Sequence, residues 1–139
     1  MPSSLSHVVV LVDDLDATVR FLTEIANIRG VQYYETEAQE IAGLFGWPVG
    51  HGAARCAFVG ESPGAVDLVE IPAALRGGVQ PGVRLLAVVN RDAAAAGERA
   101  AAAGLGVRGP FHTTAATGSP MALVEIDVGG VPFELVQFS

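Results

Sequence analysis

Short apolar runs separated by turn residues predict four strands and one helix in the first half of the chain. The run at 5–12 is rich in β-branched residues and has the length of a strand. The acids at 13–16 suit the first turn of a helix, which apolar residues at helical spacing continue as far as Gly30. Further strands are expected at 31–36, 53–59 and 65–71.

The second half repeats this order after a connector at 73–82 that contains glycine and proline. An apolar strand is expected at 83–89, and an alanine-rich helix opens at Asp92 and ends near Gly104. The last strands are expected near 107–114, 121–127 and 131–138. The predicted order in both halves is therefore strand, helix and three strands, which indicates an α+β fold of two βαβββ modules.

Two local matches support a duplication. Residues 7–13 align with 84–90, and residues 65–70 align with 132–137. A half of about 65 residues cannot cover both faces of its own sheet, so the two halves must share one core. We predict a single domain over 1–139, with module one at about 5–72, the connector at about 73–82 and module two at about 83–138.

Ionisable residues occupy related places in the predicted strands. His7, Asp67, Arg84 and Glu134 each stand in an apolar strand, and side chains two positions apart share a face. The apolar residues expected on their faces are Val9 and Leu11, Val69 and Ile71, Leu86 and Val88, and Val136 and Phe138. If a helix covers one face of each half-sheet, these faces line a shared cavity. Ionisable groups there are costly unless they are paired or bind a cation.

Two interpretations of this cluster follow from its chemistry. A neutral imidazole and two carboxylates, from His7, Asp67 and Glu134, suit a divalent iron, manganese, nickel or zinc ion and leave positions open for substrate oxygens. Alternatively, Arg84 lies between Asp67 and Glu134 as an ion-pair cluster, with His7 hydrogen-bonded beside it. Arginine itself cannot be a metal ligand.

The two ends of the chain resemble a known family. His7 with 12–21 (VDDLDATVRF), and 127–137 (DVGGVPFELVQ), are similar to the opening and closing motifs of the glyoxalase / bleomycin-resistance / dioxygenase group, the vicinal oxygen chelate superfamily. The resemblance covers essentially the whole chain. It implies paired βαβββ modules that form a curled mixed sheet around one cavity, often with dimerisation, and a metal held by the first, fourth, fifth and eighth strands.

The resemblance also assigns ligand positions. His7 and Glu134 match the first and last positions. Asp67 falls on the fourth-strand position, where glutamate, glutamine or histidine is more usual. Arg84 falls on the fifth-strand position, usually histidine or glutamine, and is a departure from the pattern.

Other side chains are candidates for the cavity wall. Arg55 is expected to share a face with Ala57 and Val59 and could bind a substrate carboxylate; otherwise it faces solvent or an acid. The aromatic rings of Tyr34, Phe45 and Trp47 could form a wall or lid over a flat ligand, or ordinary core.

The amino-acid composition limits the kinds of partner that the chain can bind. The chain has 139 residues, of which 50% are hydrophobic and 17% charged, with a net charge of -7 and arginine as its only strongly basic residue. These values exclude a disordered chain and disfavour nucleic acid and membrane surfaces. The single cysteine, Cys56, excludes an internal disulfide and a thiolate zinc site. No apolar run spans a membrane and the start lacks the features of a secretory signal, so a cytoplasmic location is expected.

Two functions are predicted. In the first, the protein binds a small oxygenated metabolite as a divalent-metal-dependent isomerase, lyase or epimerase, in which Glu134 or Asp67 moves a proton. In the second, it is a metal-free drug- or metabolite-binding protein of the bleomycin-resistance type, which Arg84 and the acidic charge favour. Dioxygenase chemistry is disfavoured because it would need a second histidine. In either case the family suggests a homodimer.

Overall fold

The computed structural model describes residues 4–37, 43–48, 50–115 and 118–139. In module one, β1 (Ser4–Val12) leads into α1 (Leu15–Arg20) and the π-helical turn η1 (Phe21–Ile25), followed by β2 (Val31–Thr36), β3 (Ala54–Val59) and β4 (Ala65–Glu70). After the short turn η2 (Ala73–Leu75), module two contains β5 (Gly82–Val89), α3 (Ala93–Ala102), β6 (Gly106–Thr114), β7 (Pro120–Val128) and β8 (Val131–Phe138). The predicted order of the elements is confirmed.

Both helices begin at an aspartate, as the sequence predicts. Asp14 and Asp92 each accept a hydrogen bond of 3.0 Å from the backbone N–H three residues further on, which satisfies a free donor of the first turn. The small residues of α3 let it approach the sheet closely. A Cβ atom added at Gly97 would lie only 2.9 Å from a methyl group of Val124 on β7.

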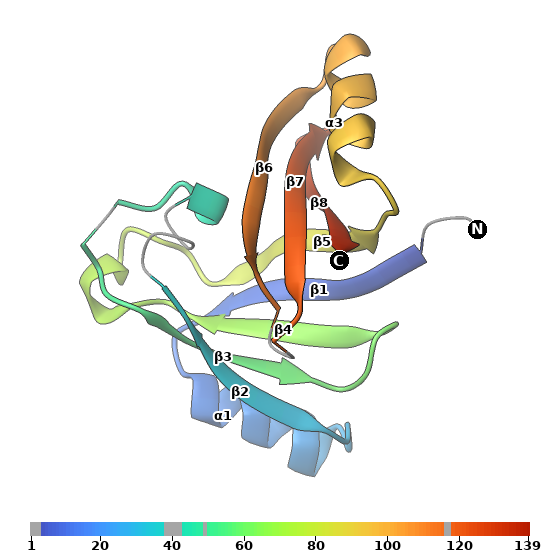
Figure 1. Ribbon diagram of the computed structural model, residues 1–139. Coiled ribbons are helices and arrows are strands. Elements are labelled where there is room, and N and C mark those ends of the chain that lie inside the picture. The colour runs from blue at the N-terminus through green and yellow to red at the C-terminus, as the bar shows by residue number, and fades with distance from the viewer. Residues whose placement is uncertain (1–3, 38–42, 49, 116–117) are drawn as a thin grey trace.

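The strands form one eight-stranded sheet in the order β2-β3-β4-β1-β5-β8-β7-β6. Strands β1 and β4 pair in parallel, as do β5 and β8, and the antiparallel pair of β1 and β5 joins the two modules at the centre. Figure 1 shows the sheet curling, with α1 behind the strands of module one and α3 beside β7 and β8. The α+β fold with a curled sheet is therefore confirmed. None of the helices among the described residues is long and apolar enough to cross a membrane.

The buried apolar residues divide according to the two faces of the sheet. One cluster on the concave side combines both modules, with Val9 and Val69 packed in the same group as Leu123 and Val136. A second cluster lies between α1 and module one, and a third between α3 and module two. Since the concave cluster needs residues from both halves, neither module completes its core alone.

Two irregularities interrupt the central pairing of β1 with β5. Ser6 is skipped on β1, and Arg84 is skipped on β5, where Val9 pairs with Leu85 and Val10 with Val83. A bulge of this kind shifts the alternation of side chains by one residue. Leu85 and Ala87 therefore lie in the concave cluster. The prediction that Leu86 and Val88 occupy that face was wrong, because it continued the two-residue period through the bulge.

Candidate functional site

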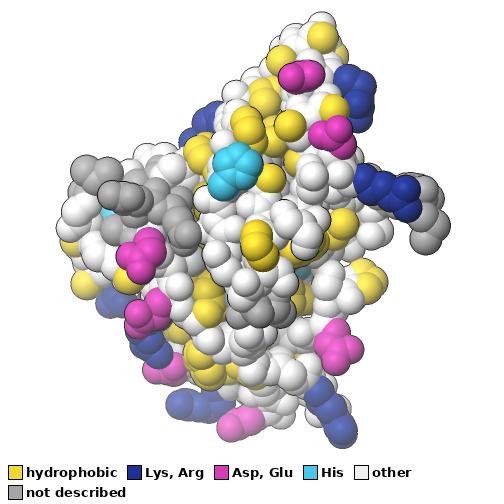
Figure 2. Space-filling view, in the orientation of Figure 1, with side chains coloured by type: hydrophobic (Ala, Val, Ile, Leu, Met, Phe, Trp, Pro, Cys, Tyr) yellow, Lys and Arg dark blue, Asp and Glu magenta, His cyan; other side chains and the backbone are white. Residues whose placement is uncertain are grey.

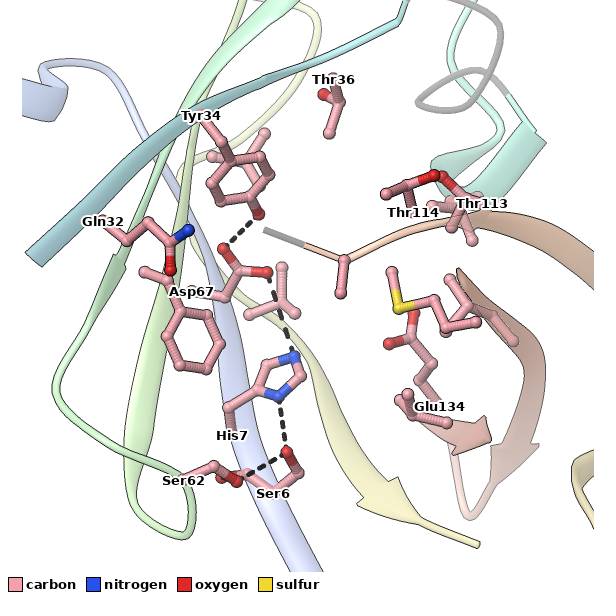
Figure 3. A pocket seen from close by; sticks show the side chains of 18 of the residues that line it. Ser6, His7, Gln32, Tyr34, Thr36, Ser62, Asp67, Thr113, Thr114 and Glu134 are labelled. Carbon is pink, nitrogen blue, oxygen red and sulfur yellow. Dashed lines mark hydrogen bonds and ion pairs between the residues drawn. The ribbon is translucent and has the colours of Figure 1, made fainter. Parts of the chain in front are cut away.

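The concave side of the sheet encloses a cavity of about 410 Å³. Its wall combines residues of β1, β2, β3, β4, β7 and β8 with the segment around Phe45 and the end of β6. His7, Asp67 and Glu134, the three metal ligands predicted from the sequence, all line it. Figure 3 shows His7 and Asp67 on one wall and Glu134 on the opposite wall.

One row of paired residues across the sheet explains why His7 and Glu134 meet. Arg108 pairs with Glu125, Glu125 with Glu134, Glu134 with Ala87, and Ala87 with His7. Residues directly opposite one another on neighbouring strands project to the same face. The small side chain of Ala87 therefore leaves open space between the imidazole and the carboxyl group.

A hydrogen-bonded wall surrounds Asp67 on β4. The Tyr34 hydroxyl donates to Asp67 Oδ1 at 2.5 Å, and His7 Nε2 lies 3.9 Å from Asp67 Oδ2 (Figure 3). Burial raises the pKa of Asp67 to about 7, although the hydrogen bond from Tyr34 acts to lower it. Burial lowers the pKa of His7 to about 4, so its imidazole is neutral near neutral pH.

Two serines extend this wall beyond His7. Ser6 Oγ lies 3.0 Å from His7 Nδ1 and 2.9 Å from Ser62 Oγ. Ser6 therefore donates to Nδ1 when the imidazole carries its proton on Nε2, toward Asp67. The pattern of residues along β1 does not predict this contact, because only the bulge at Ser6 turns its side chain inward beside that of His7.

Glu134 on β8 stands alone on the other wall. Glu134 is 6% exposed, and within the described part of the chain its carboxyl group makes no hydrogen bond or ion pair. Burial raises the pKa of Glu134 to about 8, and the nearby carboxyl groups of Asp67 and Glu125 act in the same direction. Arg84 opposes the shift. Glu134 is therefore a predominantly protonated group that faces the cavity at neutral pH.

Arg84 joins a second cluster, which the sequence analysis did not foresee. Arg84 Nη2 lies 2.8 Å from Glu125 Oε1, and Arg108 binds the other oxygen of Glu125. Arg108 also donates to the Leu44 carbonyl oxygen at 2.8 Å, and the Arg84 guanidinium lies 5.3 Å from the centre of the Phe45 ring. The predicted position of Arg84 between Asp67 and Glu134 was wrong. The cluster instead holds the segment around Phe45 against module two.

The aromatic candidates are divided between cavity and core. Tyr34 and Phe45 line the cavity. Trp47 belongs to the concave apolar cluster, with 8% of its surface exposed, and packs against Phe45 with the ring centres 5.1 Å apart. Trp47 therefore supports the wall from behind.

Arg55 lies on the opposite face of the sheet, outside the cavity. It does share that face with Ala57 and Val59, but these residues pack under α1. Its guanidinium pairs with Asp16 at 2.9 Å and with Glu70 at 3.5 Å. The interpretation of Arg55 as a cavity-wall residue does not fit this placement, because the alternation pattern fixes which residues share a face but not which face is concave.

With this geometry in view, comparisons with known proteins identify the family. The sequence model of the Glyoxalase/Bleomycin resistance protein/Dioxygenase superfamily matches residues 4–135. The chain belongs to this superfamily. The resemblance seen in its terminal motifs is thereby confirmed. No functionally curated protein shows significant similarity to the chain.

Solved structures with the same fold are distant in sequence. Methylmalonyl-CoA epimerase from Mycobacterium tuberculosis is 20% identical with a TM-score of 0.68, and the match covers 97% of this chain and 87% of that chain. A variant of methylmalonyl-CoA epimerase from Streptomyces coelicolor, in complex with 2-nitronate-propionyl-CoA, is 19% identical with a TM-score of 0.69, covering 96% and 93%. A hypothetical protein from Bacillus halodurans is 14% identical with a TM-score of 0.67, covering 99% and 95%. These similarities establish the fold.

Members of this superfamily typically use a divalent metal ion. Imidazole and carboxylate are suitable donor types for one. However, within the described ranges no three His, Cys, Asp or Glu side chains come together around a point that could hold an ion. Glu134 stands on the opposite wall from His7 and Asp67, and Arg84 is committed to Glu125. The residues as arranged do not form a metal site, and no step below depends on one.

Proposed function

We propose that this chain transfers a proton at a carbon atom next to a carbonyl group of a small metabolite, as an epimerase or isomerase. The observation that carries the proposal is the pair of carboxyl groups from Asp67 and Glu134. They come from matching strands of the two modules, line one cavity, and face each other across it. Epimerisation needs a base on one side of the carbon and an acid on the other, and two opposed walls provide both.

The environments of the two carboxyl groups give them different roles. The pKa of Asp67, raised to about 7, leaves a large ionised fraction near neutral pH, whereas that of Glu134, raised to about 8, leaves most of it protonated. Two titratable groups with separated pKa values form an acid–base pair. Asp67 then removes the proton and Glu134 returns one to the opposite face. In the reverse direction the roles exchange.

The fold neighbours named as methylmalonyl-CoA epimerases support this class of reaction. The proposal does not extend to their substrate. The cavity of about 410 Å³ accommodates a small molecule, since ligand sites commonly begin at about 300 Å³.

Deuterium exchange tests the reaction. A panel of chiral 2-methyl ketones, esters and acyl thioesters, methylmalonyl-CoA among them, would be incubated with the protein in D₂O and followed by proton NMR. We expect exchange at the carbon next to the carbonyl, reduced by about 10²–10⁴ in Asp67→Asn and Glu134→Gln. Glu61→Gln is the matched control, because Glu61 is an exposed carboxylate at the rim of the same cavity. Exchange that persists in both variants would contradict the proposal.

A metal-free binding protein is the second candidate, and the pairing of Arg84 with Glu125 favours it. This pairing removes the residue at the fifth-strand ligand position from the cavity. The same NMR samples separate the candidates. Ligand resonances that broaden or shift in the presence of the protein, without any exchange across the panel, would identify a binding protein.

The predicted iron, manganese, nickel or zinc ion has its own test. The sequence predicts His7, Asp67 and Glu134 as its ligands, although Glu134 lies on the opposite wall from the other two. About one ion per chain in protein purified without chelator, lost in His7→Ala, would establish the site. Exchange by chelator-treated, metal-free protein would assign the reaction to the two carboxyl groups alone, which the described arrangement favours.

A homodimer and a cytoplasmic location remain expectations, and sedimentation at the 14.3 kDa mass of one chain would contradict the first.

A further inference from the structure

We infer that the cavity selects ligands whose enclosed part carries no negative charge, so that its natural ligand is an uncharged carbonyl compound with an apolar body. This inference uses the cavity of the proposed function but not its reaction. It concerns binding alone, and it therefore stands or falls independently of proton transfer.

The cavity lining contains acidic residues but no arginine or lysine. The acidic residues are Asp67, Glu134 and Glu61. The chain has eight arginines and no lysine, and all eight lie within the described ranges. The His7 imidazole in the wall already has neighbours at both nitrogens, with Ser6 Oγ 3.0 Å from Nδ1 and Asp67 Oδ2 3.9 Å from Nε2. An anion that entered would lose its hydration and meet carboxyl groups without gaining a cation.

The two arginines closest to the cavity are already engaged. Arg84 and Arg108 share the carboxylate of Glu125, which is 4% exposed, and neither belongs to the cavity lining. Turning either guanidinium toward a ligand would break its ion pair with the buried carboxylate of Glu125.

The other arginines lie farther from the site. Arg55 pairs with acids on the outer face, and Arg76 donates to the Asp13 carbonyl oxygen. The remaining four, Arg20, Arg29, Arg91 and Arg99, are exposed and do not line the cavity. On the face seen in Figure 2, the dark blue arginine side chains lie near the outline of the molecule.

The rest of the lining suits an uncharged, apolar body. Phe45, Phe58, Met121 and Leu123 contribute apolar surface to the wall. Hydroxyl groups such as that of Thr114 stand at the same site and can donate to a carbonyl oxygen. The enclosed part of methylmalonyl-CoA would bring a free carboxylate into these surroundings. We therefore expect this chain to discriminate against that compound.

A pair of probes matched in shape but not in charge tests the inference on chelator-treated protein. 4-Phenylbutanamide and 4-phenylbutanoate share one apolar body and differ in charge, and titration calorimetry or protein-observed NMR gives both affinities. We expect the amide to bind at least about tenfold more tightly. Equal or tighter binding of the carboxylate would overturn the inference. Failure of both probes to bind would also overturn it, because an open cavity of this size and composition should admit the amide.

A variant with an added cation makes the test independent of the apolar group chosen for the probes. Thr114 is exposed and lines the cavity, so Thr114→Arg adds a guanidinium at the site without disturbing the core. We expect the ratio of the affinity for 4-phenylbutanoate to that for the amide to rise about fivefold or more. Val128→Arg is the matched control, since Val128 is 42% exposed and lies outside the lining. An equal rise in this affinity ratio for the control would show that the net charge of the chain, and not the cavity, causes the discrimination. That result would overturn the inference.

Discussion

The two walls of the cavity come from equivalent strands of a duplicated module, yet they use their polar residues in different ways. The polar side chains of the module-one wall face the cavity. There Tyr34 contacts Asp67, and Asp67 in turn lies beside His7. In module two, Arg84 turns to Glu125 and leaves Glu134 without a partner among the described residues. Duplication thus preserves the positions of the side chains, while a change of residue at one position redirects the interactions around it.

The largest expected effect tests the module-two cluster. Glu125→Gln removes the carboxylate shared by two arginines, of which Arg84 has a largely buried side chain (19% exposed) and Arg108 a more exposed one (41%). We expect the free energy of unfolding to fall by about 2–4 kcal/mol, measured by urea denaturation, because two guanidinium groups lose their negatively charged partner. The control is Asp16→Asn, which breaks the exposed pair with Arg55. We expect no measurable change there, and an equal loss in both variants would show that burial of Glu125 is not the cause.

The isolation of Glu134 predicts a pH-dependent stability. Its pKa is raised from 4.5 to about 8 by burial, so the folded protein binds this proton more tightly than the unfolded chain does. The contribution of Glu134 to stability is therefore fully present below about pH 4.5 and is lost as the pH rises toward 8. In chelator-treated protein, Glu134→Gln should gain about 1–3 kcal/mol over the wild type between pH 5 and pH 8. If the free energies of unfolding of the two proteins changed in parallel with pH, Glu134 would not be a buried, unpaired carboxyl group.

Asp67 on the other wall should behave in the same direction over a narrower range. Its pKa is raised from 3.8 to about 7, so the stability that it contributes is lost as the pH rises from about 4 to 7. His7 acts in the opposite sense. Since burial lowers its pKa from 6.5 to about 4, its contribution is present above pH 6.5 and is lost on acidification through this interval. Curves for Asp67→Asn and His7→Gln should therefore deviate from the wild type in opposite directions.

The smallest expected effect concerns the hydroxyl group that holds Asp67. Tyr34→Phe removes the 2.5 Å hydrogen bond and should cost about 1 kcal/mol of stability. It should also raise the pKa of Asp67, since that hydrogen bond acts to lower it, and so move the rise of exchange activity to higher pH. Tyr33→Phe, one position away on the same strand and 56% exposed, should change neither property. An unshifted pH profile in Tyr34→Phe would show that the hydroxyl does not control Asp67.

Much of the fold and part of the site were predictable from local patterns. The order of the elements followed from strand-length apolar runs, and the helix starts followed from Asp14 and Asp92. The faces of His7, Asp67 and Glu134 followed from the two-residue period, because the pairing is unbroken from His7 to Val9 on β1, around Asp67 on β4 and around Glu134 on β8. The same period failed on β5, since the bulge at Arg84 leaves no mark in the residue pattern.

The sequence by itself determined the duplicated strand–helix–strand order, the superfamily and the buried place of three ionisable side chains, because alternation, capping and paired motifs are short-range properties of the chain. Only the tertiary structure decided which face of the sheet is concave, and hence that Arg55 lies outside the cavity. It also decided that Arg84 and Arg108 both turn to Glu125. Those outcomes depend on the curl of the sheet and on contacts between strands distant in sequence, which no local pattern records.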